Sequence, residues 1–325
     1  MALLTTTFAG LNLKNPVIIS SSGLTNSVEK IKKLEQAGAG AVVLKSVFEE
    51  QINMQTGQMH GYGSPEADDY LGAYVRSHAL NEHISLIEGA KKECNIPIIA
   101  SINCYSDSEW VDFAQLMEKA GADALELNIL CLQTDTDYEF GSFEHRHIEI
   151  LRHIKKVVNI PVIMKLGSNL TNPIALINQL YANGAAAVVL FNRFYQPDIN
   201  IDKMSFVSSN VMSTPNELAD KIRWTAIASA KVPNIDYAVS GGVHCAKGLV
   251  KAILAGASAT EICSTIYQNG NEQIGEILKE LTLWMDENNY KNIQEFKGKM
   301  NAESAGSVNP FERTQFMKYY SNHEE

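Results

Sequence analysis

The sequence predicts an α/β protein that folds as one (β/α)8 barrel, and three observations support this prediction. A helix-ending glycine followed by a short apolar run occurs four times, and runs opened by proline alternate with it, giving eight strands in total. A barrel of this kind needs only about 250 residues, so the 325 residues of the chain leave a surplus for loops. We therefore expect a single TIM barrel over residues 1–299 and a polar tail over residues 300–325.

The first repeated phrase consists of Ala-Gly or Asn-Gly, small residues and an apolar run. Its copies are Ala37–Leu44, Ala120–Leu127, Asn183–Leu190 and Ala255–Ile262. Glycine just past a helix adopts the left-handed conformation that ends it, and the apolar run that follows is typical of a strand buried on both faces.

In the second phrase proline precedes an apolar run, a position where its missing N–H does least harm to a strand. Its copies are Asn15–Ile19, Asn95–Ala100, Asn159–Met164 and, more loosely, Asp236–Ser240. The two phrases together predict strands that start near residues 16, 41, 97, 124, 161, 186, 236 and 259.

The surplus residues lie in three insertions, at 47–80, 131–143 and 193–215, each after the end of a predicted strand. In this fold the active site lies at the C-terminal ends of the strands. We therefore expect these insertions to build and cover the site.

Composition excludes some classes of function. Lysine and arginine number 27 against 37 aspartates and glutamates, a net charge of −10 without a basic run, which argues against nucleic acid as a partner. The five cysteines are scattered without a CxxC motif, which favours a reducing compartment. The sequence shows neither a signal peptide nor an apolar run of about 18 residues. We expect a cytoplasmic protein with no membrane contact.

Polar residues at the strand ends are the candidates for chemistry. They are Ser20–Gly23, Lys45, Ser46, Asn103, Asn128, Cys131, Lys165, Asn192, Ser240–Gly242, Cys263 and Ser264. Two lysines and three amides with few acids predict a basic mouth that suits an anionic or phosphorylated ligand. We expect no metal site, because His145 and His147 are two residues apart and do not share a helix face.

Individual residues leave alternatives open. Gly241 and Gly242 let backbone N–H groups approach a phosphate, or simply make a tight turn. Lys45 and Lys165 follow apolar runs and are expected to point into the mouth toward an anionic partner, although such lysines are also found as solvated rim charges. Cys131 is either a base or an inert small residue.

These residues resemble those of the FMN-dependent dihydroorotate dehydrogenases, especially their soluble cytoplasmic branch, and of the FMN domain of dihydropyrimidine dehydrogenase. The likeness runs from Asn15 to about Lys299. Its marks are Ser21–Gly23, Lys45-Ser46, Ala122–Asn128, Lys165-Leu166, Ser240–Val243 and Tyr290–Gly298.

The resemblance implies an FMN cofactor and a dihydropyrimidine substrate, dihydroorotate first among them. It implies that FMN is bound by Ser22, Gly23, Lys45, Ser46, Asn128, Lys165, Ser213, Gly241, Gly242, Cys263 and Ser264. It implies that substrate contacts Lys45, Asn81, Asn128, Asn192 and Arg193, with Cys131 and Lys45 in catalysis and Cys131 as the base. It also suggests a homodimer and a soluble electron acceptor such as fumarate.

The sequence departs from the family pattern on the substrate side. The family's Asn-Leu-Ser-Cys-Pro-Asn is Asn128–Gln133 here, its substrate loop is replaced by Leu71–Asn81, and arginine follows Asn192. Arg193 is a candidate partner for a substrate carboxylate. An FMN enzyme for another dihydropyrimidine or an enone, and a catalytically silent FMN-binding barrel, therefore remain alternatives. A flavin-free aldolase or isomerase barrel is disfavoured, because it would not explain why Lys45, Asn128 and Lys165 occur together at the strand ends.

Overall fold

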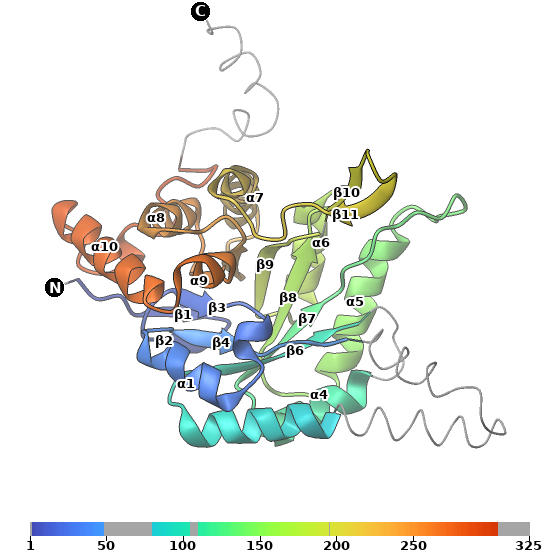
Figure 1. Cartoon of the computed structure of the whole chain (residues 1–325), viewed down its shortest axis with the longest axis horizontal. Helices are drawn as coiled ribbons and strands as arrows, with labels where there is room; N and C mark the ends of the chain where they lie inside the picture. Colours follow the sequence, from blue (N-terminus) through green and yellow to red (C-terminus); the bar gives the residue numbers. More distant parts are fainter. Residues whose placement is uncertain (1, 49–79, 105–109, 195, 305–325) are drawn as a thin grey trace, which may run out of the picture.

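The computed structural model describes residues 2–48, 80–104, 110–194 and 196–304, which form a closed α/β barrel of the TIM type (Figure 1). Its eight parallel strands are β3 (Val17–Ile19), β4 (Ala41–Val43), β6 (Ile98–Asn103), β7 (Ala124–Asn128), β8 (Val162–Gly167), β9 (Ala187–Asn192), β12 (Asp236–Ser240) and β13 (Ala259–Ile262). Each pairs with the next, and β13 pairs with β3 to close the ring. The eight predicted strand starts lie within one residue of those observed, so the barrel prediction is confirmed.

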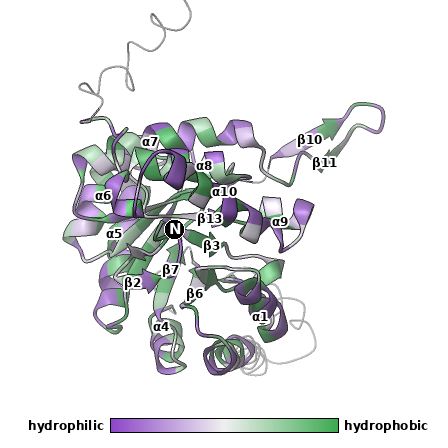
Figure 2. Cartoon of the chain, turned by 90° about the vertical axis from the view of Figure 1, so that its left-hand side faces the viewer, coloured by the Kyte–Doolittle hydropathy of each residue, from purple (hydrophilic) through white to green (hydrophobic). Residues whose placement is uncertain are grey.

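Helices surround this ring, one or two after each strand, and Figure 2 shows the strands inside them. They are α1 (Val28–Gln36), residues 80–93, α4 (Trp110–Lys119), α5 (Ser142–Lys155), α6 (Pro173–Ala182), α7 (Leu218–Lys231), α8 (Ala246–Ala255), α9 (Ser264–Asn269) and α10 (Gln273–Glu287). The 3₁₀-helices are η1 (Gly23–Thr25), η2 (Pro215–Glu217) and η3 (Ile293–Glu295). The glycines of the first repeated phrase all have the predicted left-handed backbone, at Gly38, Gly121, Gly184 and Gly256.

One end of the barrel interior is apolar and closed. The antiparallel hairpin β1 (Thr6–Phe8) and β2 (Leu11–Leu13) packs Phe8 and Leu13 against interior residues such as Ile18 and Ile163. The N–H of Ala9 donates to Asp236, the first residue of β12, so the hairpin covers the N-terminal end of the strands. Only the opposite, C-terminal end is left for a ligand.

Two of the three insertions fall within the described residues, and both follow strand ends as predicted. Residues 131–141 connect β7 to α5, and residues 193–214 include the antiparallel hairpin β10 (Pro197–Asn200) and β11 (Ser205–Ser208). This hairpin projects from the barrel (Figures 1 and 2). The insertion at 47–80 begins with β5 (Val47–Phe48), which pairs with β6, and its residues 49–79 lie outside the described part.

The predicted tail begins as part of the barrel. The N–H of Met300 donates to Leu254 O and that of Ala302 to Ala226 O, which ties both residues to α8 and α7. Residues 305–325 lie outside the described part of the chain. No helix among the described residues is long and apolar enough to cross a membrane.

Candidate active site

A cavity of about 450 Å³ opens at the C-terminal ends of the strands. This volume is within the range of small-molecule and cofactor sites, about 300–1,000 Å³. Ten of the predicted site residues line it: Ser46, Asn128, Lys165, Asn192, Arg193, Ser213, Gly241, Gly242, Cys263 and Ser264. Five others are not among its lining residues: Ser22, Gly23, Lys45, Asn81 and Cys131.

One end of the cavity is lined by a turn that presents backbone N–H and side-chain hydroxyl groups. The N–H of Gly242 donates to Ser213 Oγ at 3.3 Å, and the N–H of Ser213 donates to Ser264 Oγ at 3.0 Å. Gly242 has a left-handed φ of 83°, and a Cβ added there would lie 2.6 Å from the backbone nitrogen of Leu218. Only glycine fits this turn, and its polar groups suit a phosphate.

His244 belongs to the same end, although the sequence analysis did not select it. Its Nε2 lies 3.1 Å from Ser213 Oγ, and its carbonyl accepts hydrogen bonds from Thr265 Oγ1 and Gln273 Nε2. These bonds link the loop after β12 to the helices after β13. The histidine directly after a strand-end Gly-Gly-Val was the signal that could have identified it.

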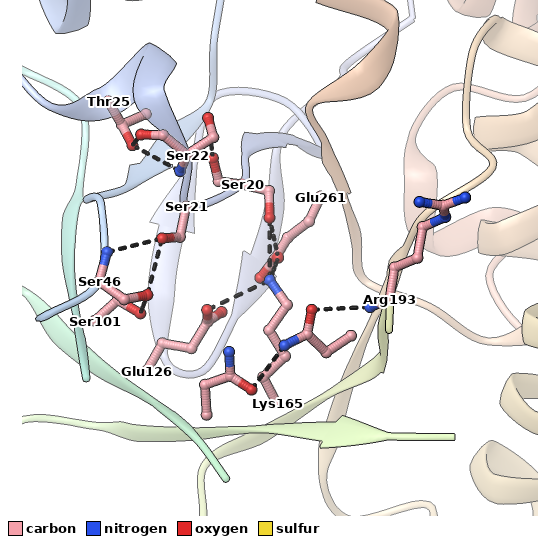
Figure 3. A network of polar contacts seen from close by, with 12 residues as sticks. Ser20, Ser21, Ser22, Thr25, Ser46, Ser101, Glu126, Lys165, Arg193 and Glu261 are labelled. Carbon is pink, nitrogen blue, oxygen red and sulfur yellow. Dashed lines mark hydrogen bonds and ion pairs between the residues drawn. The ribbon is translucent and has the colours of Figure 1, made fainter. Parts of the chain in front are cut away.

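Beneath the cavity, Lys165 lies between two buried glutamates (Figure 3). Its ammonium Nζ donates to Glu261 Oε2 at 2.5 Å, to Ser20 Oγ at 3.0 Å and to Glu126 Oε1 at 3.4 Å. Ser20 Oγ in turn donates to Glu261 Oε2 at 3.0 Å. We call Ser20, Glu126, Lys165 and Glu261 the charge cluster.

The charge cluster follows from strand alternation. Ser20, Glu126, Lys165 and Glu261 each lie two residues beyond an apolar interior residue, at Ile18, Ala124, Ile163 and Ala259. Side chains two apart on a strand point to the same face, so all four enter the barrel one layer above its apolar core. The expectation of few acids at the mouth was therefore wrong, because Glu126 and Glu261 sit inside it and offset the charge of Lys165.

Burial and the neighbouring charges set the protonation of this cluster. Burial, together with repulsion from Glu261, raises the pKa of Glu126 well above its ordinary value. Burial alone would raise the pKa of Glu261 too, but the Lys165 charge and hydrogen bonds from Glu126, Lys165 and Ser20 lower it. Burial would lower the pKa of Lys165, but the two glutamates together raise it.

Hydroxyl groups extend this network toward the first two strands. Ser46 Oγ lies 2.9 Å from Ser21 Oγ and 2.8 Å from Ser101 Oγ (Figure 3). Ser46 is buried, whereas the preceding Lys45 is exposed. Lys165 lines the cavity, as expected for a strand-end lysine that points into the mouth, whereas Lys45 is not among the lining residues and is exposed, as in the alternative of a solvated rim charge.

The opposite wall of the cavity carries amides and Arg193. Asn192 Nδ2 donates to Asn128 Oδ1 at 2.9 Å, and the N–H of Arg193 donates to Asn192 Oδ1 at 2.8 Å. The Arg193 guanidinium is already engaged by Glu217 Oε2, Val211 O and Asn210 O, at 2.7–2.9 Å. These contacts use three of the five N–H donors of the guanidinium, so two remain for a ligand.

Cys131 and Asn81 lie at the margin of the site. Cys131 is partly buried on the loop after β7, its carbonyl accepts from Asn169 Nδ2 at 2.9 Å, and its Sγ donates to Leu132 O at 3.4 Å. Leu130, one residue earlier, lines the cavity. Asn81 is exposed near the start of the helix at 80–93. Among the described residues, no group of three His, Cys, Asp or Glu side chains is placed to hold a metal ion.

Comparisons with known proteins agree with this arrangement. The family model described as "Dihydroorotate dehydrogenase" matches residues 3–285. The chain is 30% identical to a Thermoplasma volcanium protein over 310 residues, covering 92% of this chain and 98% of that protein. It is 27% identical to a Thermoplasma acidophilum protein and 26% identical to one from Methanocaldococcus jannaschii, covering 92% and 88% of this chain and 99% and 95% of theirs. All three carry the name "Dihydroorotate dehydrogenase B (NAD(+)), catalytic subunit".

Proposed function

Because this chain belongs to the dihydroorotate dehydrogenase family, whose members are oxidoreductases acting on CH–CH bonds, we propose that it binds FMN and oxidises dihydroorotate to orotate. The observation that carries the proposal is the cavity described above, which joins a glycine and serine turn to a wall of lysine and amides. Members of the family bind FMN.

The residues of the cavity fit this cofactor. The turn of Ser213, Gly242 and Ser264 would hold the phosphate with backbone N–H and hydroxyl groups, because Gly242 leaves no side chain in the way. Asn128 and Lys165, at paired positions of the consecutive strands β7 and β8, would lie beside the ring system. FMN would supply the acceptor for the hydride.

Protein groups would supply the rest of the reaction. Oxidation of dihydroorotate removes one hydride and one proton from adjacent carbons, and Cys131 as thiolate would take the proton. Asn128 and Asn192, joined by their hydrogen bond, present a fixed amide surface to the pyrimidine ring. Arg193 would bind the substrate carboxylate with the two guanidinium N–H groups that its three protein contacts leave free.

A second candidate is an FMN oxidoreductase for a different cyclic substrate. The apolar residues Leu130 and Val211 line the cavity, and Cys131 itself is outside the lining. These positions favour a less polar ring, such as another dihydropyrimidine or an enone.

Turnover with a dye acceptor tests these candidates together. Protein purified with its flavin is assayed with dihydroorotate, dihydrouracil and a cyclic enone, after the FMN content has been measured by absorbance. We expect about one FMN per chain and the highest kcat/KM with dihydroorotate. Protein that takes up no FMN would refute the proposal, and a higher kcat/KM with another compound would favour the second candidate.

The relatives' names also bear on the electron acceptor and the assembly. They state NAD(+) and a catalytic subunit, so we propose NAD⁺ as the final acceptor, reached through a second polypeptide, instead of fumarate. The names give no support to the predicted homodimer. We expect the isolated chain to reduce a dye with dihydroorotate but NAD⁺ only slowly. Fast NAD⁺ reduction by the chain alone would contradict this.

A further inference from the structure

The Lys165 ammonium has no hydrogen left for a ligand. An ammonium carries three N–H donors, and those of Lys165 are directed at Ser20 Oγ, Glu126 Oε1 and Glu261 Oε2. The side chain is 5% exposed, so water does not compete for these bonds. A lysine expected to serve as a free cation at the mouth is instead held from three sides.

The number of carboxyl groups in the charge cluster exceeds the number of cations. Glu126 and Glu261 are 0% and 1% exposed, and Lys165 is the one cation within reach among the described residues. Two ionised carboxylates would leave one buried negative charge unpaired, which is costly. They would also leave Glu126 Oε2 and Glu261 Oε1, which are buried without a hydrogen-bond partner, carrying charge without a donor.

The geometry indicates how the cluster avoids this cost. Glu261 has the short contact to Lys165 and hydrogen bonds from Ser20 and Glu126, whereas the contact from Lys165 to Glu126 is long, at 3.4 Å. A carboxylate that accepts more hydrogen bonds is the one that stays ionised. Glu126 is therefore the group that keeps a proton, as its raised pKa also indicates.

We propose that Glu126 and Glu261 share one proton, so that Lys165 faces the cofactor seat as half of a neutral ion pair, and that these positioning residues thereby lower the reduction potential of bound FMN. This inference rests on the proposed binding of FMN. Reduced flavin carries more negative charge than oxidised flavin, so an unpaired ammonium nearby would stabilise it more strongly than a paired one does.

The proposal predicts a non-additive pattern in variants. In E126Q the Glu261 carboxylate still pairs with Lys165. In E261Q we expect Glu126 to ionise, because a buried ammonium without a counter-charge is costly. Each single variant therefore keeps one negative charge beside Lys165, and only the double variant E126Q/E261Q removes it.

The FMN reduction potential of the intact holoenzyme measures this pattern, against a reference dye. We expect each single variant to stay within threefold of wild type in the equilibrium constant for reduction. The double variant should favour reduced FMN by tenfold or more, about 30 mV for a two-electron couple. A tenfold rise in the equilibrium constant for FMN reduction in either single variant would mean that both carboxylates are ionised in the wild type, and it would overturn the proposal. An unchanged reduction potential in all three variants would also overturn it.

Infrared spectroscopy of the flavin-free protein tests the shared proton without FMN and without the double variant. The carbonyl stretch of a buried carboxylic acid should be present in the wild type and absent from both E126Q and E261Q. A wild type without this band would overturn the proposal even if FMN binds. If the band is present but FMN does not bind, the proposed function fails while the shared proton stands.

Discussion

The barrel mouth has two sides that differ in how their polar groups are held. On the side proposed for the cofactor, Lys165, Gly242 and Ser264 are buried or half-buried, and each is hydrogen-bonded to other protein groups. On the side proposed for the substrate, Cys131 and Arg193 lie on insertions, and Asn81 is exposed near the start of the helix at 80–93. The first three residues lie within two positions of the ends of β8, β12 and β13, so we expect the cofactor seat to depend on the strand ends and substrate choice to depend on the added loops.

The largest expected effect on the cofactor side is at Gly242. In Gly242→Ala the new Cβ meets backbone at 2.6 Å and the residue keeps a left-handed φ, so the turn must move. We expect FMN affinity to fall about 100-fold, measured by fluorescence titration of the flavin-free protein.

Gly241→Ala is the matched control, because it has a similar φ of 88° but its Cβ would meet only the flexible end of Lys221, at 3.2 Å. Its affinity loss should be at least tenfold smaller. Equal losses in the two variants would show that backbone conformation, not the close approach at Gly242, is what matters.

On the substrate side the largest effect belongs to Cys131. Serine is a much weaker base than a thiolate, so Cys131→Ser should lower kcat with dihydroorotate by about 10²–10⁴-fold and leave FMN content unchanged. Cys245→Ser, at an exposed cysteine outside the cavity lining, is the control. Unchanged turnover in the Cys131 variant would remove the role of base from this residue.

Substitution of Arg193 should affect dihydroorotate and dihydrouracil differently. If its guanidinium binds the carboxylate, Arg193→Gln should raise KM for dihydroorotate by about 10- to 100-fold, the range of a hydrogen bond to a charged group. KM for dihydrouracil, which lacks the carboxylate, should change little. Equal increases for both compounds would mean that Arg193 acts only through its bonds to Glu217, Asn210 and Val211.

A smaller effect concerns stability and pH. Because the pKa of Glu126 is raised by burial, the folded protein keeps this proton at a pH where the unfolded chain has lost it. The contribution of Glu126 to stability is therefore full below its ordinary pKa of 4.5 and declines as pH rises above that value. Because Glu126→Gln cannot titrate, its free energy of unfolding should increase relative to that of wild type as pH rises, by at most about 1.4 kcal/mol per pH unit. Urea denaturation at pH 5 and pH 8 measures this difference, and a constant gap between the two proteins would contradict it.

The sequence predicted the strands well because their limits are chemically marked. Glycines that end helices and prolines that precede strands bracket short apolar runs, and these alone located all eight barrel strands. The position of Lys45 was left open between the mouth and a solvated rim, because a local pattern does not show that its neighbour Ser46 is the residue that is buried and lines the cavity.

The charge cluster was missed although a signal was present. Glu126, Lys165 and Glu261 each interrupt a buried apolar run, and each lies two residues after an interior position. Charges of opposite sign inside strands of one barrel must pair, because unpaired burial is costly. Which carboxyl keeps the proton depends on contacts between strands 39 to 241 residues apart in sequence, which no local pattern contains.

Anaerobic titration of the FMN-loaded protein with dihydroorotate tests the central claim most directly. The account predicts that dihydroorotate bleaches the flavin absorbance, with one equivalent of orotate formed for each flavin reduced. A flavin that dithionite bleaches but dihydroorotate leaves oxidised would contradict it.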